Sequence, residues 1–159
     1  MNRVIEPVLL LSFLQRATSR FESKLGGEPY MTWMDQYPLN GRGDPLHFLC
    51  QINFEEMAPL PSFPKEGILQ FYITRDYGHM PWSGFCEENG DWRVIYHPTI
   101  NRDPDLQATV PPIDPSRHFP FQGEFHISGT YNEETTRFKT PREDAYAGSE
   151  ICFVIIVSS

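Results

Sequence analysis

The sequence has no long apolar run and few basic residues, and these two absences exclude several classes of protein. No stretch approaches the roughly 18 apolar residues of a membrane-spanning helix. The chain has 13 Lys and Arg against 21 Asp and Glu, which gives a net charge of −8 at pH 7. Such a charge repels phosphate backbones and anionic lipids, so we expect neither a nucleic acid nor a membrane as partner. A basic partner fits better.

Cysteine is scarce, and the common catalytic and metal-binding motifs are missing. The three cysteines are far apart and form no Cys-x-x-Cys pair, which disfavours a disulfide framework and a zinc knuckle. The five histidines form no His-x-His or His-x-x-x-His pair, and no serine stands in a Gly-x-Ser-x-Gly elbow. We therefore expect no metal, no cofactor and no catalytic residue, and we favour a binding function over an enzymatic one.

An apolar run near the start, residues 8–14, superficially looks like a secretory signal. Glu6 and Pro7 interrupt the approach to this run, and Gln15 and Arg16 follow where a small-residue cleavage site would stand. The sequence therefore favours the cytoplasm.

The chain does have enough hydrophobic residues for one folded domain, and it is rich in Gly and Pro, which interrupt regular secondary structure. Its 159 residues are 40% hydrophobic and 14% aromatic, so we expect a single domain over residues 1–159. The 11 Gly and 15 Pro favour short strands and turns over long helices. Six of these prolines fall within residues 98–120 and predict an extended connector, with further strands in residues 121–159.

Hydrophobic periodicity predicts one helix and several strands. Apolar residues spaced by three and four predict a helix over residues 5–23, ended by the adjacent glycines that follow. Alternating or continuous apolar runs predict strands at residues 46–54, 67–73 and 92–97. A short strand at 123–131 and a buried one at 151–157 follow. The expected fold is mainly β, of the α+β class: an antiparallel, sandwich-like sheet with one N-terminal helix and a Pro-rich connector.

Four motifs in order give the chain a resemblance to a known family. They are Leu25-Gly26-Gly27-x-Pro29, Gly43-x-Pro45-Leu46-x-Phe48-Leu49-x-Gln51-Ile52-Asn53, Pro64-x-x-Gly67-Ile68-Leu69-Gln70-Phe71-Tyr72 and Trp92-Arg93-Val94-Ile95-Tyr96. In this order and spacing, residues 24–97 resemble the YwqG-like family of bacterial proteins, a domain of unknown function. The resemblance implies a largely β fold with a few helices and no established catalytic activity.

The resemblance covers only the N-terminal half of the family pattern. Family members are usually longer, and their second glycine-rich motif and further Gln-containing strand are not found after Tyr96. The chain is therefore expected to be a short variant or the front half of a longer ancestor. In the second case a partner chain or a homodimer supplies the missing surface.

Two clusters of residues are candidate binding sites. His47, Gln51 and Asn53 alternate along one strand and share one face, where three polar side chains converge on a ligand. The alternatives are a solvated face and hydrogen bonding to neighbouring loops. Trp92 and Tyr96 from a neighbouring predicted strand complete this candidate pocket.

The second cluster lies in the connection between two predicted strands. Tyr77 and Trp82 stand there beside the acidic residues Glu87, Glu88 and Asp91. Aromatic anchors rimmed by charge are typical of protein-binding surfaces, although packing of the rings beneath the loop is the alternative.

Two functions from different classes remain open. The first is a small acidic protein-binding module that engages a basic partner, for example an immunity protein that neutralises a toxin, or that associates with itself. The second is a small-ligand-binding or enzymatic domain with a polar pocket around His47, Gln51 and Asn53. The first is preferred because no motif demands chemistry.

Overall fold

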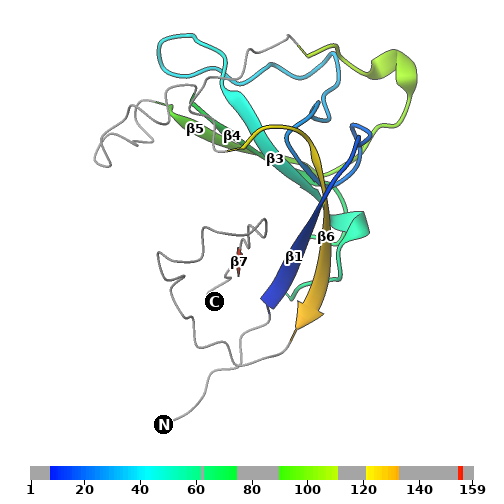
Figure 1. Cartoon of the computed structure of the whole chain (residues 1–159). Helices are drawn as coiled ribbons and strands as arrows, with labels where there is room; N and C mark the ends of the chain where they lie inside the picture. The colour runs from blue at the N-terminus through cyan, green and yellow to red at the C-terminus, as the bar shows by residue number, and fades with distance from the viewer. Residues whose placement is uncertain (1–7, 62, 75–89, 111–120, 133–153, 156–159) are drawn as a thin grey trace, which may run out of the picture.

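The computed structural model describes residues 8–61, 63–74, 90–110, 121–132 and 154–155, and these form one antiparallel sheet (Figure 1). Its strand order is β5-β4-β3-β2-β6-β1-β7. The strands are β1 (Val8–Gln15), β2 (Lys24–Leu25), β3 (His47–Asn53), β4 (Ile68–Ile73), β5 (Trp92–His97), β6 (Phe125–Asn132) and β7 (Val154–Ile155). Two short 3-10 helices, η1 (Phe54–Glu56) and η4 (Pro104–Leu106), are the helical turns of the described residues.

The helix predicted for residues 5–23 is wrong, because residues 8–15 of that range form β1, which pairs along its whole length with β6. Leu9 and Leu11 are buried whereas Leu14 is 61% exposed, which is the alternation of a strand with one covered face. A continuous leucine run satisfies the helical and the strand period equally well. Pairing with a distant strand, which the local sequence does not reveal, decides the outcome.

The sandwich-like arrangement is also wrong for the described part of the chain, which contains a single sheet. The strands predicted at residues 46–54, 67–73 and 92–97 are observed as β3, β4 and β5. The strand predicted at 123–131 is β6, and β7 falls within 151–157. Figure 1 shows β1 and β6 as a long two-stranded arm that leads away from β3, β4 and β5.

A β-bulge at Leu49 changes which side chains of β3 share a face. Phe48 lies opposite Tyr72, but Cys50 lies opposite the adjacent residue Phe71, so β3 carries one extra residue at this point. The simple alternation expected from the sequence put Phe48 and Cys50 on the same face. The bulge sends them to opposite faces, and it therefore separates an apolar face from a second face that carries buried amides.

The apolar face holds the larger core. Its buried members come from β1, β2, β3, β6 and the end of η1: Leu9, Leu11, Leu25, Ile52, Met57 and Ile127. On the other face, Leu46, Phe48 and Tyr72 form a smaller cluster. Complete burial of a side chain such as Leu46 contributes about 1.5–3 kcal/mol.

The second face, which we call the amide face, also buries polar side chains. Gln51, Asn53 and Gln70 are each no more than 1% exposed. They are hydrogen-bonded to residues 20–22, between β1 and β2, and to Tyr30, between β2 and β3. Of the Pro-rich connector, residues 98–110 are described and include η4; residues 111–120 lie outside the described part. No helix in the described residues is long and apolar enough to cross a membrane.

Candidate functional site

Gln51 lies at the centre of the amide face, and all its hydrogen-bonding positions are used. Its Oε1 accepts from the Tyr30 backbone N–H at 3.0 Å and from Gln70 Nε2 at 3.1 Å. Its Nε2 donates to the carbonyl oxygens of Arg20 at 2.8 Å and Glu22 at 2.9 Å. Because backbone carbonyls only accept and backbone N–H groups only donate, this network fixes the orientation of the Gln51 amide.

The orientation of Gln70 follows from that of Gln51. Gln70 Nε2 also donates to the Tyr30 carbonyl oxygen at 2.7 Å, so its Oε1 is left to accept. Two groups lie against this oxygen: the Tyr72 hydroxyl at 3.1 Å and Nε2 of His97 at 2.9 Å. His97 Nε2 must therefore carry the proton. In the neutral ring Nδ1 then has a lone pair and no proton, an assignment made from the hydrogen-bond network.

The unprotonated nitrogen of His97 faces a carboxylate. His97 Nδ1 lies 3.9 Å from Asp35 Oδ1. The other oxygen, Oδ2, accepts hydrogen bonds from the Thr32 backbone N–H and from its hydroxyl, both at 2.7 Å. Desolvation lowers the pKa of His97 from its ordinary value, and the charge of Asp35 opposes this effect. His97 is thus neutral at pH 7, and two hydrogen-bond acceptors face each other.

These two acceptors lie in a cleft of about 470 Å³ beside β5. The cleft is lined by Tyr30, Thr32, Trp33, Met34, Asp35, Ile95, Tyr96, His97, Pro98, Thr99, Asn101 and Leu106. Trp33 is 64% and Met34 73% exposed, large values for side chains of this kind. Asp35 is the only carboxylate among these lining residues, and none of them is a lysine or arginine.

The cleft walls are held by contacts between two segments that lie far apart in the sequence. The Trp33 backbone N–H donates to the Leu106 carbonyl oxygen at 3.1 Å, and the Asn101 N–H donates to the Tyr30 hydroxyl at 2.9 Å. The Tyr30 ring meets His97 edge-on, with 5.1 Å between ring centroids. The cleft is therefore built before any partner arrives.

The structure places His47, Gln51 and Asn53 in β3, all of them buried, but the prediction that they share one face is wrong: His47 pairs with Ile73 ahead of the bulge and Gln51 with Gln70 after it, so His47 lies on the opposite face from the two amides. The Asn53 side chain donates to the Phe21 carbonyl oxygen at 2.9 Å and accepts from the Glu55 N–H at 3.0 Å. The two amides thus bind the main chain of neighbouring segments. They line no part of the cleft; Gln51 is connected to it through its hydrogen bond with Tyr30, which lines the cleft, and through Gln70, which holds His97.

The other candidate residues are divided between the cleft, its surroundings and the part outside the described residues. Tyr96 lines the cleft, while its hydroxyl donates to the Glu66 carbonyl oxygen at 2.9 Å. Trp92 is half-buried at the start of β5, and Asp91 before it is 3% exposed. The remaining candidates lie outside the described residues: Tyr77, Trp82, Glu87 and Glu88.

Sequence reasoning missed three residues that line the cleft, Trp33, Asp35 and His97, and also Gln70, which holds His97 in place. One signal was available, since Gln70 interrupts a strand whose other residues are aliphatic or aromatic. A polar residue at such a position must be hydrogen-bonded or must serve a site. The approach of Asp35 to His97 had no signal, because 61 positions separate them and no regular spacing connects them.

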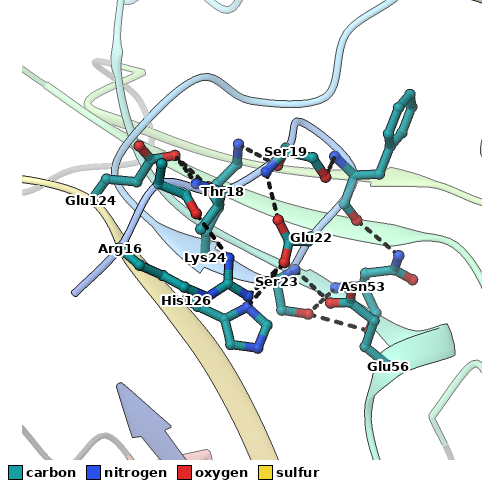
Figure 2. A network of polar contacts seen from close by, with 12 residues as sticks. Arg16, Thr18, Ser19, Glu22, Ser23, Lys24, Asn53, Glu56, Glu124 and His126 are labelled. Atoms are coloured by element: carbon teal, nitrogen blue, oxygen red, sulfur yellow. Dashed lines mark hydrogen bonds and ion pairs between the residues drawn. The ribbon is translucent and has the colours of Figure 1, made fainter. Parts of the chain in front are cut away.

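A second polar cluster lies farther along the amide face, around Lys24 (Figure 2). Lys24 is fully buried, and its Nζ donates to the Ser19 carbonyl oxygen at 2.9 Å. Burial lowers the pKa of Lys24 to about 8, while nearby carboxylates, Glu124 foremost, oppose the shift. The cluster fastens the turn that leads from β1 into β2.

Glu22 organises the outer part of this cluster. It pairs with Arg16 at 2.7 Å and accepts from the Ser19 backbone N–H at 2.5 Å. The hydrogen bond from Arg16 is the main cause that lowers the pKa of Glu22 to about 2. His126 Nδ1 lies 3.6 Å from the same carboxylate. Within the described residues no three His, Cys, Asp or Glu side chains gather in a way that could hold a metal ion.

The fold and the cleft together define a sheet-rich domain with a preformed site at an edge strand. Residues 23–152 match the model of a family described as a domain of unknown function, DUF1963, and the chain belongs to this family. The match runs well past Tyr96, so it extends beyond the segment 24–97 on which the sequence resemblance was based. No curated protein matches the chain.

Proposed function

We propose that this protein is a non-enzymatic binding module that holds an extended segment of a basic protein partner in the cleft beside β5. The observation that supports this best is the exposure of Trp33 and Met34 directly at the cleft. Large apolar side chains in a groove are the anchors that dominate protein recognition, and tryptophan is the most enriched among them. Neither side chain is needed for the core, because both are mostly exposed.

The position of β5 favours an extended partner. β5 is the outermost strand of the described sheet on this side, and β4 is its one neighbour there. An edge strand offers backbone N–H and C=O groups to an added strand, and side-chain pockets beside it give specificity. The cleft runs against Ile95, Tyr96 and His97 of this strand.

Charge favours a basic partner. The chain carries a net charge of −8, and Asp35 is the one acidic side chain among the described residues that line the cleft. Complementary charge raises the rate of association and excludes acidic competitors. We further propose that the protein is YwqG-like and works in the cytoplasm, where an inhibitor of a basic toxin, an immunity protein, is one form that this function takes.

A small-molecule site is the second candidate function. The cleft volume of about 470 Å³ falls in the range of about 300–1,000 Å³ found for small-ligand pockets. It differs from the pocket expected around His47, Gln51 and Asn53, since those side chains do not line it. A small ligand would contact Asp35 and His97 without needing the edge of β5.

The test is a selection of random dodecapeptides displayed on phage against the whole protein. We expect selected peptides to bind wild type and to lose about tenfold or more in affinity for Trp33→Ala, measured by calorimetry. Leu14→Ala is the matched control, because Leu14 is also an exposed apolar side chain, 61% accessible, but lies on β1. Equal loss in both variants, or no enriched peptide, would contradict the proposal.

The same two variants test self-association. Intact-mass measurements over a range of concentrations show whether the chain dimerises. If the chain forms a dimer that Trp33→Ala dissociates and Leu14→Ala leaves intact, a second copy of the chain occupies the cleft. This outcome would contradict the proposal of a basic partner.

A further inference from the structure

The pair of facing acceptors in the cleft points to the chemical group that it receives. Asp35 Oδ1 and His97 Nδ1 are 3.9 Å apart, and the proton of His97 is on the other nitrogen. Two lone pairs turned toward each other repel, and a donor placed against both removes that repulsion. In the described part of the chain, no hydrogen-bond donor lies against Asp35 Oδ1 at bonding distance.

The fixed geometry around the pair keeps it open. Asp35 is held through Oδ2 by both donors of Thr32, and its own backbone N–H donates to the Thr32 carbonyl oxygen at 3.0 Å. His97 is held through Nε2 by Gln70, whose amide is itself fixed by Gln51. Neither group can turn to find another partner without losing bonds in a largely buried network.

The surroundings select a cation. Asp35 supplies a negative charge, and its side chain is 31% exposed, so a partner group reaches it from the cleft. The exposed Trp33 side chain lines the same cleft, and aromatic rings attract ammonium and guanidinium groups. Among the described residues no lysine or arginine lines the cleft to fill this role internally.

We propose that the cleft receives the ammonium or guanidinium group of a lysine or arginine from the bound segment, which donates to Asp35 Oδ1 and His97 Nδ1 together. This inference rests on the proposed function, because it takes the occupant to be an extended protein segment. The long aliphatic stem of either residue lies along the apolar part of the cleft beside Trp33 and Met34. A glutamate or an apolar side chain at this position has no donor to offer and leaves both acceptors unmet.

The first test uses the peptides selected above. We expect each to contain one lysine or arginine whose replacement by norleucine, which keeps the aliphatic chain, weakens binding about tenfold or more. In Asp35→Asn, which preserves shape and removes the charge, the same replacement should change affinity less than threefold. Peptides that bind in the cleft without a basic residue would overturn this inference and leave the proposed function standing.

The second test does not need a selected peptide. Long-range ¹H–¹⁵N spectra of the histidine rings should show the proton of His97 on Nε2, and titration with N-acetyl-lysine methylamide should shift the Nδ1 resonance. N-acetyl-norleucine methylamide, the uncharged control, should not shift it. A proton on Nδ1, or equal shifts with both probes, would overturn the inference even if peptide selection fails. A shift with the lysine probe but no selected peptide would point to a free small cation and reject the protein segment.

Discussion

The centre of the amide face, around Gln51, differs from the cleft beside β5 in whether its hydrogen-bonding groups have partners. Around Gln51 every amide position has a partner in the main chain of residues 20–30 or in Gln70. In the cleft, Asp35 and His97 present acceptors to each other without a donor between them. Both regions are polar, and in neither did the sequence reveal which side chains contact each other. The difference teaches that occupancy, rather than polarity or burial, separates a structural network from a binding site.

Replacement of the central amide should have the largest effect. Gln51→Leu leaves the Tyr30 N–H and two backbone carbonyls without their partner, and each unsatisfied buried group costs about 1–3 kcal/mol. We expect the free energy of unfolding to fall by about 3 kcal/mol or more in urea titrations. Gln15→Leu, at an exposed position, is the control and should change it by less than about 0.5 kcal/mol. A neutral Gln51→Leu would remove the distinction drawn between the two regions.

Lys24 gives the next largest effect, and its sign depends on pH. The folded pKa of about 8 lies below the ordinary 10.5, so the unfolded chain binds more protons between these values. The free energy of unfolding therefore rises as the pH increases from 8 to 10.5, because of Lys24. Below pH 8 the protein bears the full cost of burying the charged Lys24. The difference corresponds to at most about 3 kcal/mol.

The measurement compares wild type with Lys24→Met at pH 7, 8 and 9. Because the Cys50 thiol has a pKa raised to about 12 by burial, it also makes stability depend on alkaline pH, but it does so equally in both proteins. The advantage of Lys24→Met over wild type should shrink as pH rises. If the difference in unfolding free energy between the two proteins does not change with pH, the burial of Lys24 does not lower its pKa. The cluster in Figure 2 would then behave like an exposed surface rather than like the core.

A substitution in the cleft should change the affinity for a partner and leave the free energy of unfolding nearly unchanged. For Asp35→Asn we expect the affinity for a lysine-containing peptide to fall about tenfold, because a charged hydrogen bond becomes a neutral one. The free energy of unfolding should fall by no more than about 1 kcal/mol, since the amide oxygen can still accept from Thr32. Parallel calorimetry and urea titration make this comparison. A large loss of stability without a loss of affinity would assign Asp35 to the structural network.

The smallest effect expected is a pH dependence of peptide binding. The described groups that face the His97 ring are Asp35, Gln70 and Tyr30, and Asp35 is the one carboxylate among them. As pH falls through the lowered pKa of His97, Nδ1 gains a proton and donates to Asp35 itself. Affinity for a lysine peptide should therefore decline as the pH falls below the ordinary histidine pKa of 6.5 and through the lowered pKa of His97, and His97→Gln should abolish the decline. Unchanged affinity in wild type would place the peptide cation away from His97.

The sequence predicted the strands better than the site, for reasons visible in particular residues. Alternation and flanking Gly and Pro located β3, β4 and β5, because each is bounded by local punctuation. β1 was mistaken for a helix, because consecutive leucines fit both periods until β6 is known to pair with them. The site joins residues 32–35 to residues 95–99, and only tertiary contacts bring these together. Gln51 was singled out from its strand pattern, but its partner Gln70 and the orientation of both amides depend on the register of β3 with β4.

The tight turn that holds Asp35 has a consequence for how this protein can diversify. Thr32 and Asp35 close the turn on each other, and the two residues between them, Trp33 and Met34, project outward with little contribution to the core. Substitutions at these two positions can therefore exchange one partner for another at almost no cost in folding. The anchoring carboxylate stays in place while the neighbouring pair of side chains varies, so the turn separates a constant recognition element from an adaptable one.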